Sequence, residues 1–357
     1  MRETARARFR RALLPLLLPS CLLVTLAPHA PAQRARAKPS PEPRQEEEVE
    51  SVSTTLVAVP VRVSDRAGRF ITDLRREQFR VFEDGVEQEI SFFEPADHPF
   101  TVALMLDVSD SASLQRGAIQ AAARAFVGQL RAGDRVMIAT FDHDIAVLTD
   151  PTDDRQVLFE AINRVRTGGG TSFYDAVEEL VGKRLSRVPG RKAVVILTDG
   201  IDTTSRATQS AAERAADESN ALVYAVQYDT VGAATPSQGG QPVSQVIAST
   251  GEPVSAAYKR ATLFLRMLAD RTGGRFYQAA SVKRLSESFA RIAEELRQQY
   301  SLGYYPKNRE GEGKRRKLKV TVDAPEARVR ARGAYVYKPR RVSRRGDRRD
   351  AVATLDD

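Results

Sequence analysis

The segment that most constrains the fold is Thr101–Ser111, TVALMLDVSDS. Its apolar run Val102–Leu106 is too short for a helix and has the composition of a buried strand. The run ends in Asp107, Ser109 and Ser111, so an acid and two hydroxyls follow one strand end. A loop leaving a strand can direct all three side chains at one point, as a hard cation with oxygen ligands requires. A polar turn followed by a helix cap is the alternative interpretation.

Two later segments also place acidic or hydroxyl side chains next to a predicted strand or helix. A second apolar strand, Arg191–Gly200 (RKAVVILTDG), also ends in an acid, Asp199. Between the two strands lies Thr167–Asp175, TGGGTSFYD, in which three glycines lead into Thr171 at the start of a predicted helix. The chain therefore contains D-x-S-x-S, then Gly-Thr, then T-D-G, spread over successive strand and helix units. This agreement favours a cation site over a simple turn.

Strands and helices alternate through the middle of the chain. Apolar spacing predicts helices at 113–130, 157–165, 173–185 and 208–220, and strands at 136–141, 145–148, 193–197, 222–226 and 275–278. Repeated alternation of this kind is typical of an α/β fold with a doubly wound, mostly parallel sheet and helices on both faces.

Both flanks of this α/β body have antiparallel β patterns. Alternating residues from Val52 onward, the strands 79–83 and 88–93 and the turn Asp84-Gly85 indicate an N-terminal β unit. The C-terminal flank has strand patterns at 300–305, 318–322 and 329–336. Neither group is large enough to bury a core alone. We therefore predict that the two groups pair into one small β-sandwich.

The three polar motifs resemble the von Willebrand factor A (VWA) domain, a Rossmann-like fold, and its metal-ion-dependent adhesion site (MIDAS). The resemblance implies that one divalent cation is held directly or through water by Asp107, Ser109, Ser111, Thr171 and Asp199. Oxygen ligands suit Mg²⁺ best and tolerate Mn²⁺ or Ca²⁺. The resemblance also implies adhesion, in which an Asp or Glu carboxylate of a protein partner reaches the metal.

A second resemblance covers about residues 52 to 337. The segments VRVSDRAGRFITDLRREQFRVFEDGVEQEISFFE, LADRTGGRFYQ, QQYSLGYYP and VRARGAYV are similar to the VWFA-related acidobacterial family of exported proteins. That family has no settled biochemical role.

The motifs leave three details open. Family members commonly have a small residue between the two serines, whereas this chain has Asp110, which would either weaken attraction for an acidic partner or recruit a second cation. Ser172–Asp175 matches the capping-box pattern S-x-x-D, so Ser172 is expected to cap a helix. Asp202 is expected to be a loop cap or an acid behind the site. The glycine run lacks a following Lys at P-loop spacing, which disfavours nucleotide binding.

The N-terminus has the pattern of an export signal. Basic residues, an apolar stretch and Ala30-Pro31-Ala32 predict a signal peptide over 1–32, followed by a disordered linker at 33–50. A lipoprotein signal ending at Cys21 is a disfavoured alternative, because the apolar run continues past that cysteine. No later stretch approaches twenty apolar residues, so we expect no transmembrane segment. The predicted location is periplasmic, cell-surface or secreted.

The predicted domain organisation follows from these patterns: signal peptide 1–32, linker 33–50, N-terminal β unit 51–97, VWA domain 98–299, C-terminal strands 300–337 and a basic disordered tail 338–357. The net charge of +9 is concentrated at the ends. Residues 1–32 contribute +4 and 338–349 contribute +6, while three C-terminal aspartates contribute −3, which leaves +2 for 33–337. A nearly neutral body gives no indication of nucleic-acid binding.

Enzyme motifs are missing from the sequence. G-x-S-x-G and H-E-x-x-H do not occur, and the one cysteine lies in the predicted signal. The leading hypothesis is therefore a non-enzymatic, exported VWA protein that binds a protein partner through its metal. The alternative is an envelope scaffold whose metal site is structural or vestigial, and a metal-assisted hydrolase is the least favoured. The sequence leaves the partner and the oligomeric state undetermined.

Overall fold

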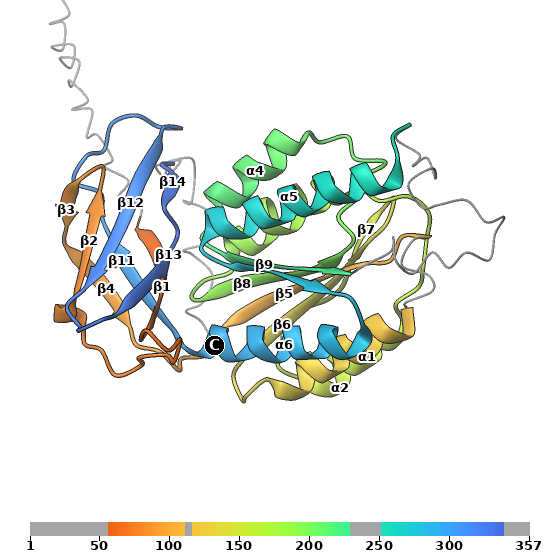
Figure 1. The fold of residues 1–357 in the computed structure, drawn as a ribbon, viewed down its shortest axis with the longest axis horizontal. Coiled ribbons are helices and arrows are strands. Elements are labelled where there is room, and N and C mark those ends of the chain that lie inside the picture. Colours follow the sequence, from red (N-terminus) through yellow and green to blue (C-terminus); the bar gives the residue numbers. More distant parts are fainter. Residues whose placement is uncertain (1–55, 111–115, 229–250, 339–357) are drawn as a thin grey trace, which may run out of the picture. The chain divides into compact units, whose positions relative to one another are not determined.

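The computed structural model describes residues 56–110, 116–228 and 251–338. It contains a six-stranded sheet, and Figure 1 shows how the elements are arranged around it. In spatial order the strands are β10 Arg275–Ala279, β9 Leu222–Tyr228, β8 Lys192–Thr198, β5 Thr101–Asp107, β6 Arg135–Phe141 and β7 Ile145–Thr152. All neighbours are parallel except β6 and β7, which form an antiparallel hairpin. The predicted α/β fold class is confirmed.

Helices cover both faces of this sheet (Figure 1). One face carries α1 Arg116–Gln129, α2 Arg155–Asn163 and α6 Val282–Arg297. The other face carries α3 Phe173–Ala176, the π-helical segment Val177–Arg184 that continues it, the 3-10 turn Leu185–Arg187, α4 Gln209–Glu218 and α5 Val254–Thr272. Strands that are buried on both faces need apolar residues at every position, which is why β5 and β8 are continuous apolar runs.

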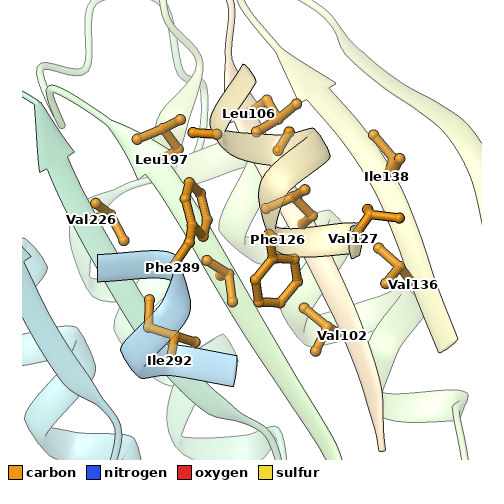
Figure 2. Close-up of a cluster of buried hydrophobic side chains, with 14 of the residues drawn as sticks. Val102, Leu106, Phe126, Val127, Val136, Ile138, Leu197, Val226, Phe289 and Ile292 are labelled. Carbon is orange, nitrogen blue, oxygen red and sulfur yellow. The ribbon is translucent and has the colours of Figure 1, made fainter. Parts of the chain in front are cut away.

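Strand β5 divides its side chains between two hydrophobic cores. Val102, Leu104 and Leu106 pack into the core beneath α1 and α6, whereas Ala103 and Met105 pack into the opposite core. Figure 2 shows the first core, where Phe126 of α1 meets Phe289 of α6 over the sheet. The centroids of these two rings are 5.4 Å apart. The central strand is therefore fixed from both sides, and its last residue, Asp107, is fixed with it.

The flanking strands form two four-stranded antiparallel sheets. The strand order of the first sheet is β13 Arg328–Ala331, β1 Val57–Ser64, β11 Gln299–Tyr304 and β4 Ile90–Glu94. The strand order of the second sheet is β14 Ala334–Val336, β12 Arg315–Val322, β2 Phe79–Glu83 and β3 Val86–Gln88. A 3-10 turn, Arg76–Gln78, precedes β2. Valines of β1, tyrosines of β11 and Phe79 of β2 share one buried cluster. The predicted β-sandwich of N- and C-terminal strands is therefore present, and β11 follows directly from α6.

Two of the predicted elements differ in the structure. The expected strand 329–336 is divided into β13 and β14, which belong to different sheets. The expected helix 173–185 changes from α to π geometry after Ala176. Within the π segment, a Cβ on Gly182 would lie 2.9 Å from the Cβ of Ala215, so glycine permits the close approach of α4.

Several predictions lie wholly or partly outside the described residues. They are the signal peptide 1–32, the linker 33–50, the start of the β unit at 51–55, Ser111, and the tail from 339 onward. The domain boundaries stay predictions. Within the described ranges, no helix has both the length and the apolar character needed to cross a membrane.

Candidate functional site

The polar residues that the sequence predicts to form a site follow neighbouring strands of the parallel sheet. Leu106 of β5 is paired with Leu197 of β8, so the two strands end side by side. Asp107 is 0% exposed and Asp199 is 1% exposed. Two carboxylates are thus buried at the carboxyl-terminal edge of the sheet, where ligand sites of doubly wound folds lie.

The carboxylate of Asp107 accepts hydrogen bonds from neutral groups. The backbone N of Ser109 donates to Oδ1 at 3.0 Å, and the Ser109 hydroxyl donates to the same oxygen at 2.6 Å. The hydroxyl of Thr198 donates to Oδ2. Within the described part of the chain, no lysine or arginine forms an ion pair with Asp107.

Burial and a like charge both act on Asp107. Loss of solvent disfavours its ionised form, and the neighbouring Asp199 adds repulsion, so that the pKa of Asp107 is raised to about 7. The hydrogen bonds from Ser109 and Thr198 act in the opposite direction but do not offset these two effects. A cation placed beside these carboxylates would lower the pKa again, because it favours the ionised form.

The turn after β8 fixes the position of Asp199. The backbone N of Ile201 donates to Asp199 Oδ1 at 3.0 Å, and the buried amide of Gln227 donates to the Asp199 carbonyl at 2.8 Å. Gly200 has a φ of +81°, and a Cβ there would lie 2.7 Å from Cδ1 of Leu265. Glycine adopts this left-handed conformation without strain and leaves room for α5, which accounts for the glycine of the T-D-G motif.

The glycine loop places Thr171 at this edge of the sheet. The N of Gly168 donates to Val108 O at 2.9 Å, and Gly169 O accepts from the N of His143 at 3.0 Å. Thr171 itself is 4% exposed, and its N donates to the hydroxyl of Thr203 at 2.8 Å. The loops after β5, β6 and β8 are therefore tied to one another. The structure brings Asp107, Ser109, Thr171 and Asp199 to one edge, whereas Ser111 lies outside the described residues.

Ser172 does not cap its helix as the sequence predicts. It occupies the residue before α3, but its hydroxyl donates to His143 O and contacts the Thr204 hydroxyl, both at 2.9 Å. Asp202, which lies in the loop after β8, accepts a hydrogen bond from the N of Tyr174 at 3.1 Å. It thereby provides a partner for a backbone N–H in the first turn of α3. This arrangement is consistent with the loop-cap interpretation of Asp202. The predicted capping box is wrong, because Asp202, which is distant in sequence, caps the helix in place of Ser172.

The acids at the rim are more exposed than the buried pair. Asp110 is exposed, and its Oδ2 lies 3.7 Å from the position that a Cβ of Gly169 would occupy. His143 and Asp144 are exposed and lie in the hairpin between β6 and β7. Among the described residues, no group of three or more His, Cys, Asp or Glu is arranged to hold a metal. A cation here would therefore depend on two carboxylates supplemented by hydroxyl oxygens.

Two contributors to the site were not identified from the sequence. Thr198 binds Asp107 and also accepts from the N of Gly200 at 2.8 Å, so one hydroxyl links both strand ends. Gln227, fully buried on β9, holds the backbone of Asp199. The only available signal was a polar residue in an otherwise apolar strand, since a buried polar side chain needs a partner.

The fold and the edge just described define a doubly wound α/β domain with carboxylates and hydroxyls gathered at the carboxyl ends of its strands. Residues 102–201 match the family model of the von Willebrand factor type A domain. Residues 102–201 therefore form a von Willebrand factor type A domain within this chain. The match includes Asp107, Ser109, Thr171 and Asp199.

Solved structures with detectable similarity are distant from this chain. The vWF domain of the type V pili tip protein Mfa5 from Porphyromonas gingivalis is 13% identical over 55% of this chain and 94% of that one, with a TM-score of 0.41. A von Willebrand factor type A structure from Catenulispora acidiphila is 13% identical over 73% of both chains, with a TM-score of 0.45. Proximal thread matrix protein 1 from the mussel byssus, described with a zinc-occupied MIDAS motif, is 15% identical over 60% of this chain and 49% of that one, with a TM-score of 0.44. The search of curated proteins returned no match.

Proposed function

We propose that this chain is an exported VWA-domain protein that binds a protein partner through a divalent cation. The observation that carries the proposal is the pair of buried carboxylates, Asp107 and Asp199, at adjacent strand ends. The hydrogen bonds to Asp107 come from neutral donors. Buried charges in proteins are normally paired or coordinate a metal, and a divalent cation would balance both acids.

The donor set fits such a cation. We propose Asp107, Ser109, Ser111, Thr171 and Asp199 as its direct or water-mediated ligands. All five side chains offer oxygen atoms, which suit Mg²⁺ and also Mn²⁺ or Ca²⁺. When bound, the cation would supply an electrophilic centre that attracts an external carboxylate.

The surrounding residues hold the ligands in place before binding. Ser109 and Thr198 orient the two oxygens of Asp107, and the glycine turn at Gly200 directs the chain away from β8. Preorganisation of this kind lowers the entropy lost when a ligand binds.

We propose that the partner contributes an Asp or Glu side chain. Only two of the five proposed ligands are charged, so the bound cation would keep affinity for one further anionic oxygen. The predicted signal at 1–32 places the encounter outside the cytoplasm, in the periplasm, on the cell surface or in the medium. We propose no catalytic function for the site.

Metal binding is the first test. Isothermal titration of Mg²⁺ into the chelator-treated wild type should show one site that is lost in Asp107→Ala. Asp323→Asn is a matched control, because Asp323 is an exposed aspartate on the sandwich. Equal Mg²⁺ binding by all three proteins would reject the proposed ligands.

Partner capture is the second test. Affinity capture from the native cell envelope should recover a partner in Mg²⁺, and EDTA or Asp107→Ala should abolish recovery. In the scaffold alternative, recovery would survive EDTA and be lost when residues 338–357 are deleted. That outcome would replace metal-dependent adhesion by assembly through the sandwich and tail.

A further inference from the structure

A cleft lined with arginines lies at the opposite edge of the parallel sheet. It has a volume of about 860 Å³ and is bounded by β1, β13, β10 and α6. Its five arginines are Arg69, Arg275, Arg291, Arg328 and Arg330, and we refer to it as the arginine cleft. Arg275 is the first residue of β10, whereas Asp107 is the last residue of β5 and Asp199 follows the last residue of β8. The two sites are therefore at opposite ends of the strands.

The glutamates of the cleft do not neutralise these arginines. Glu295 is already bound by Arg62, by Arg275 at 2.8 Å and by the hydroxyl of Tyr277 at 2.8 Å. Its single negative charge thus lies between two guanidinium groups. Glu294 is the one other acid of the lining and is exposed to solvent. Five arginines and two glutamates give the lining residues a formal charge of +3, and two of these arginines are also paired with acids outside the lining, Arg69 with Asp65 at 2.8 Å and Arg330 with Asp270 at 3.0 Å.

Two of the arginines are available to an incoming ligand. Arg291 on α6 and Arg328 on β13 are exposed, and their guanidinium groups form no hydrogen bond or ion pair within the described ranges 56–110, 116–228 and 251–338. Arg330, in contrast, is bound to Asp270 and to the carbonyl of Gly274. Arg291 and Arg328 come from two different parts of the fold, so a ligand that reaches both would span the cleft.

The lining favours one class of anion. Guanidinium groups bind carboxylates through paired, planar hydrogen bonds. Phe70 and Val329 add apolar surface, which a compact polyphosphate would leave uncontacted. A peptide that alternates acidic and apolar side chains matches this mixture of arginine and apolar surface.

We propose that the arginine cleft binds an acidic peptide segment of a protein partner, at a second site separate from the metal edge. Arg291 and Arg328 bind its carboxylates, and Phe70 and Val329 contact its apolar side chains. This binding requires no divalent cation.

The test uses the full chain and a fluorescein-labelled octapeptide of alternating Glu and Val, followed by fluorescence anisotropy in EDTA. The double variant Arg291→Gln/Arg328→Gln should weaken binding about tenfold or more, as expected for lost charged hydrogen bonds. The control double variant Arg284→Gln/Arg309→Gln removes the same charge from exposed positions outside the lining. It should retain binding within about twofold. The basic tail is identical in all these proteins and contributes the same background.

A gain of affinity separates binding from misfolding. Glu294→Gln removes the repelling charge and should tighten binding of the acidic octapeptide about twofold to threefold. Equal losses in the two double variants would overturn the proposal, as would equal binding of an octapeptide of alternating Gln and Val. Tighter binding of inorganic tripolyphosphate than of the acidic octapeptide would assign the cleft to phosphate instead. Because EDTA is present throughout, failure here leaves the metal proposal intact.

Discussion

Glu83 in the β-sandwich and Asp107 in the VWA domain are both buried acids, but their partners differ. Glu83 is 3% exposed and accepts from Arg316 at 2.7 Å and from the hydroxyls of Tyr304 and Tyr335 at 2.6 Å each. Asp107 accepts from hydroxyls and a backbone N, and the charge of another acid, Asp199, acts on it. The sandwich supplies the arginine that pairs with Glu83, whereas we propose that an external cation balances the charge of Asp107 and Asp199.

This difference separates stability from function. A buried acid with an arginine and two tyrosine partners completes the interior of a small sandwich. Asp107 is buried, has neutral hydrogen-bond donors and lies beside a second acid, so its ionised form opposes folding, and a bound cation would offset this cost. Strain of this kind is expected at binding sites, and the surrounding packing of β5 and β8 tolerates it.

The largest effect is expected for Glu83→Gln. Removing the acid leaves Arg316 buried without its counter-charge, which should lower the free energy of unfolding by about 3–5 kcal/mol. Urea denaturation measures this loss. Glu87→Gln is the matched control, because Glu87 is half-exposed and 3.9 Å from Arg80, and it should change stability by less than about 0.5 kcal/mol. Similar effects of the two substitutions would contradict the role of Glu83.

Asp107→Asn should change stability in opposite directions with and without metal. In EDTA it should raise the free energy of unfolding by about 1–2 kcal/mol, because it removes repulsion from Asp199. In Mg²⁺ at 100 times the dissociation constant, the wild type should gain about 2.7 kcal/mol that the variant lacks. Thermal unfolding in the two buffers measures both effects, and Asp323→Asn should follow the wild type. If the variant is less stable than the wild type in both buffers, repulsion between Asp107 and Asp199 does not destabilise the metal-free protein.

Lys192, like Asp107, is a buried ionisable residue whose pKa is shifted by loss of solvent. Its Nζ donates to the carbonyls of Ser186 at 3.2 Å and Val188 at 2.8 Å, and burial lowers the pKa of Lys192 to about 8. The unfolded chain therefore binds the proton of the Lys192 ammonium group more tightly than the folded chain does. The contribution of Lys192 to the free energy of unfolding consequently rises between about pH 8 and pH 10.5.

Lys192→Met should consequently stabilise the protein at pH 7.5 by about 1–2 kcal/mol, with the difference shrinking as the pH approaches 10.5. Urea titrations across this range measure the difference. The exposed Lys283→Met serves as control and should show no such pH dependence. A constant difference between wild type and Lys192→Met would mean that Lys192 does not titrate in this range.

The smallest effect is expected for Asp110→Asn at the rim of the metal site. An exposed charge near a cation site adds modest attraction, so the substitution should weaken Mg²⁺ binding about twofold to threefold. Isothermal titration measures the change. A loss of more than about tenfold would instead make Asp110 a ligand.

Local patterns predicted the regular parts of both regions. The apolar runs of β5 and β8, with acids directly after them, were enough to predict a parallel sheet with polar groups at one edge. The alternating valines of β1 predicted its buried face, and Val57, Val59, Val61 and Val63 are all buried. Such patterns succeed because burial on a strand repeats with a fixed period.

The same patterns failed where a distant segment decides the environment. Alternation alone places Arg62 opposite the buried valines, yet it is 4% exposed, because its guanidinium binds Glu295 and the carbonyl of Gly273. The run 329–336 has one continuous β pattern, but the chain changes sheet near Arg332, whose guanidinium binds Ala58 O at 2.6 Å. Neither partner is close to these residues in sequence.

The sequence by itself determined the VWA fold, the antiparallel flanks and the order of the polar motifs, because strand and helix periodicity are local properties of the chain. Tertiary structure alone decided that Thr198 would bind Asp107, that Asp202 would replace Ser172 as the helix cap, and that arginines from β13 and α6 would line one cleft. Hydrogen bonds and ion pairs depend on which side chains meet in space, and that is set by packing of the whole domain.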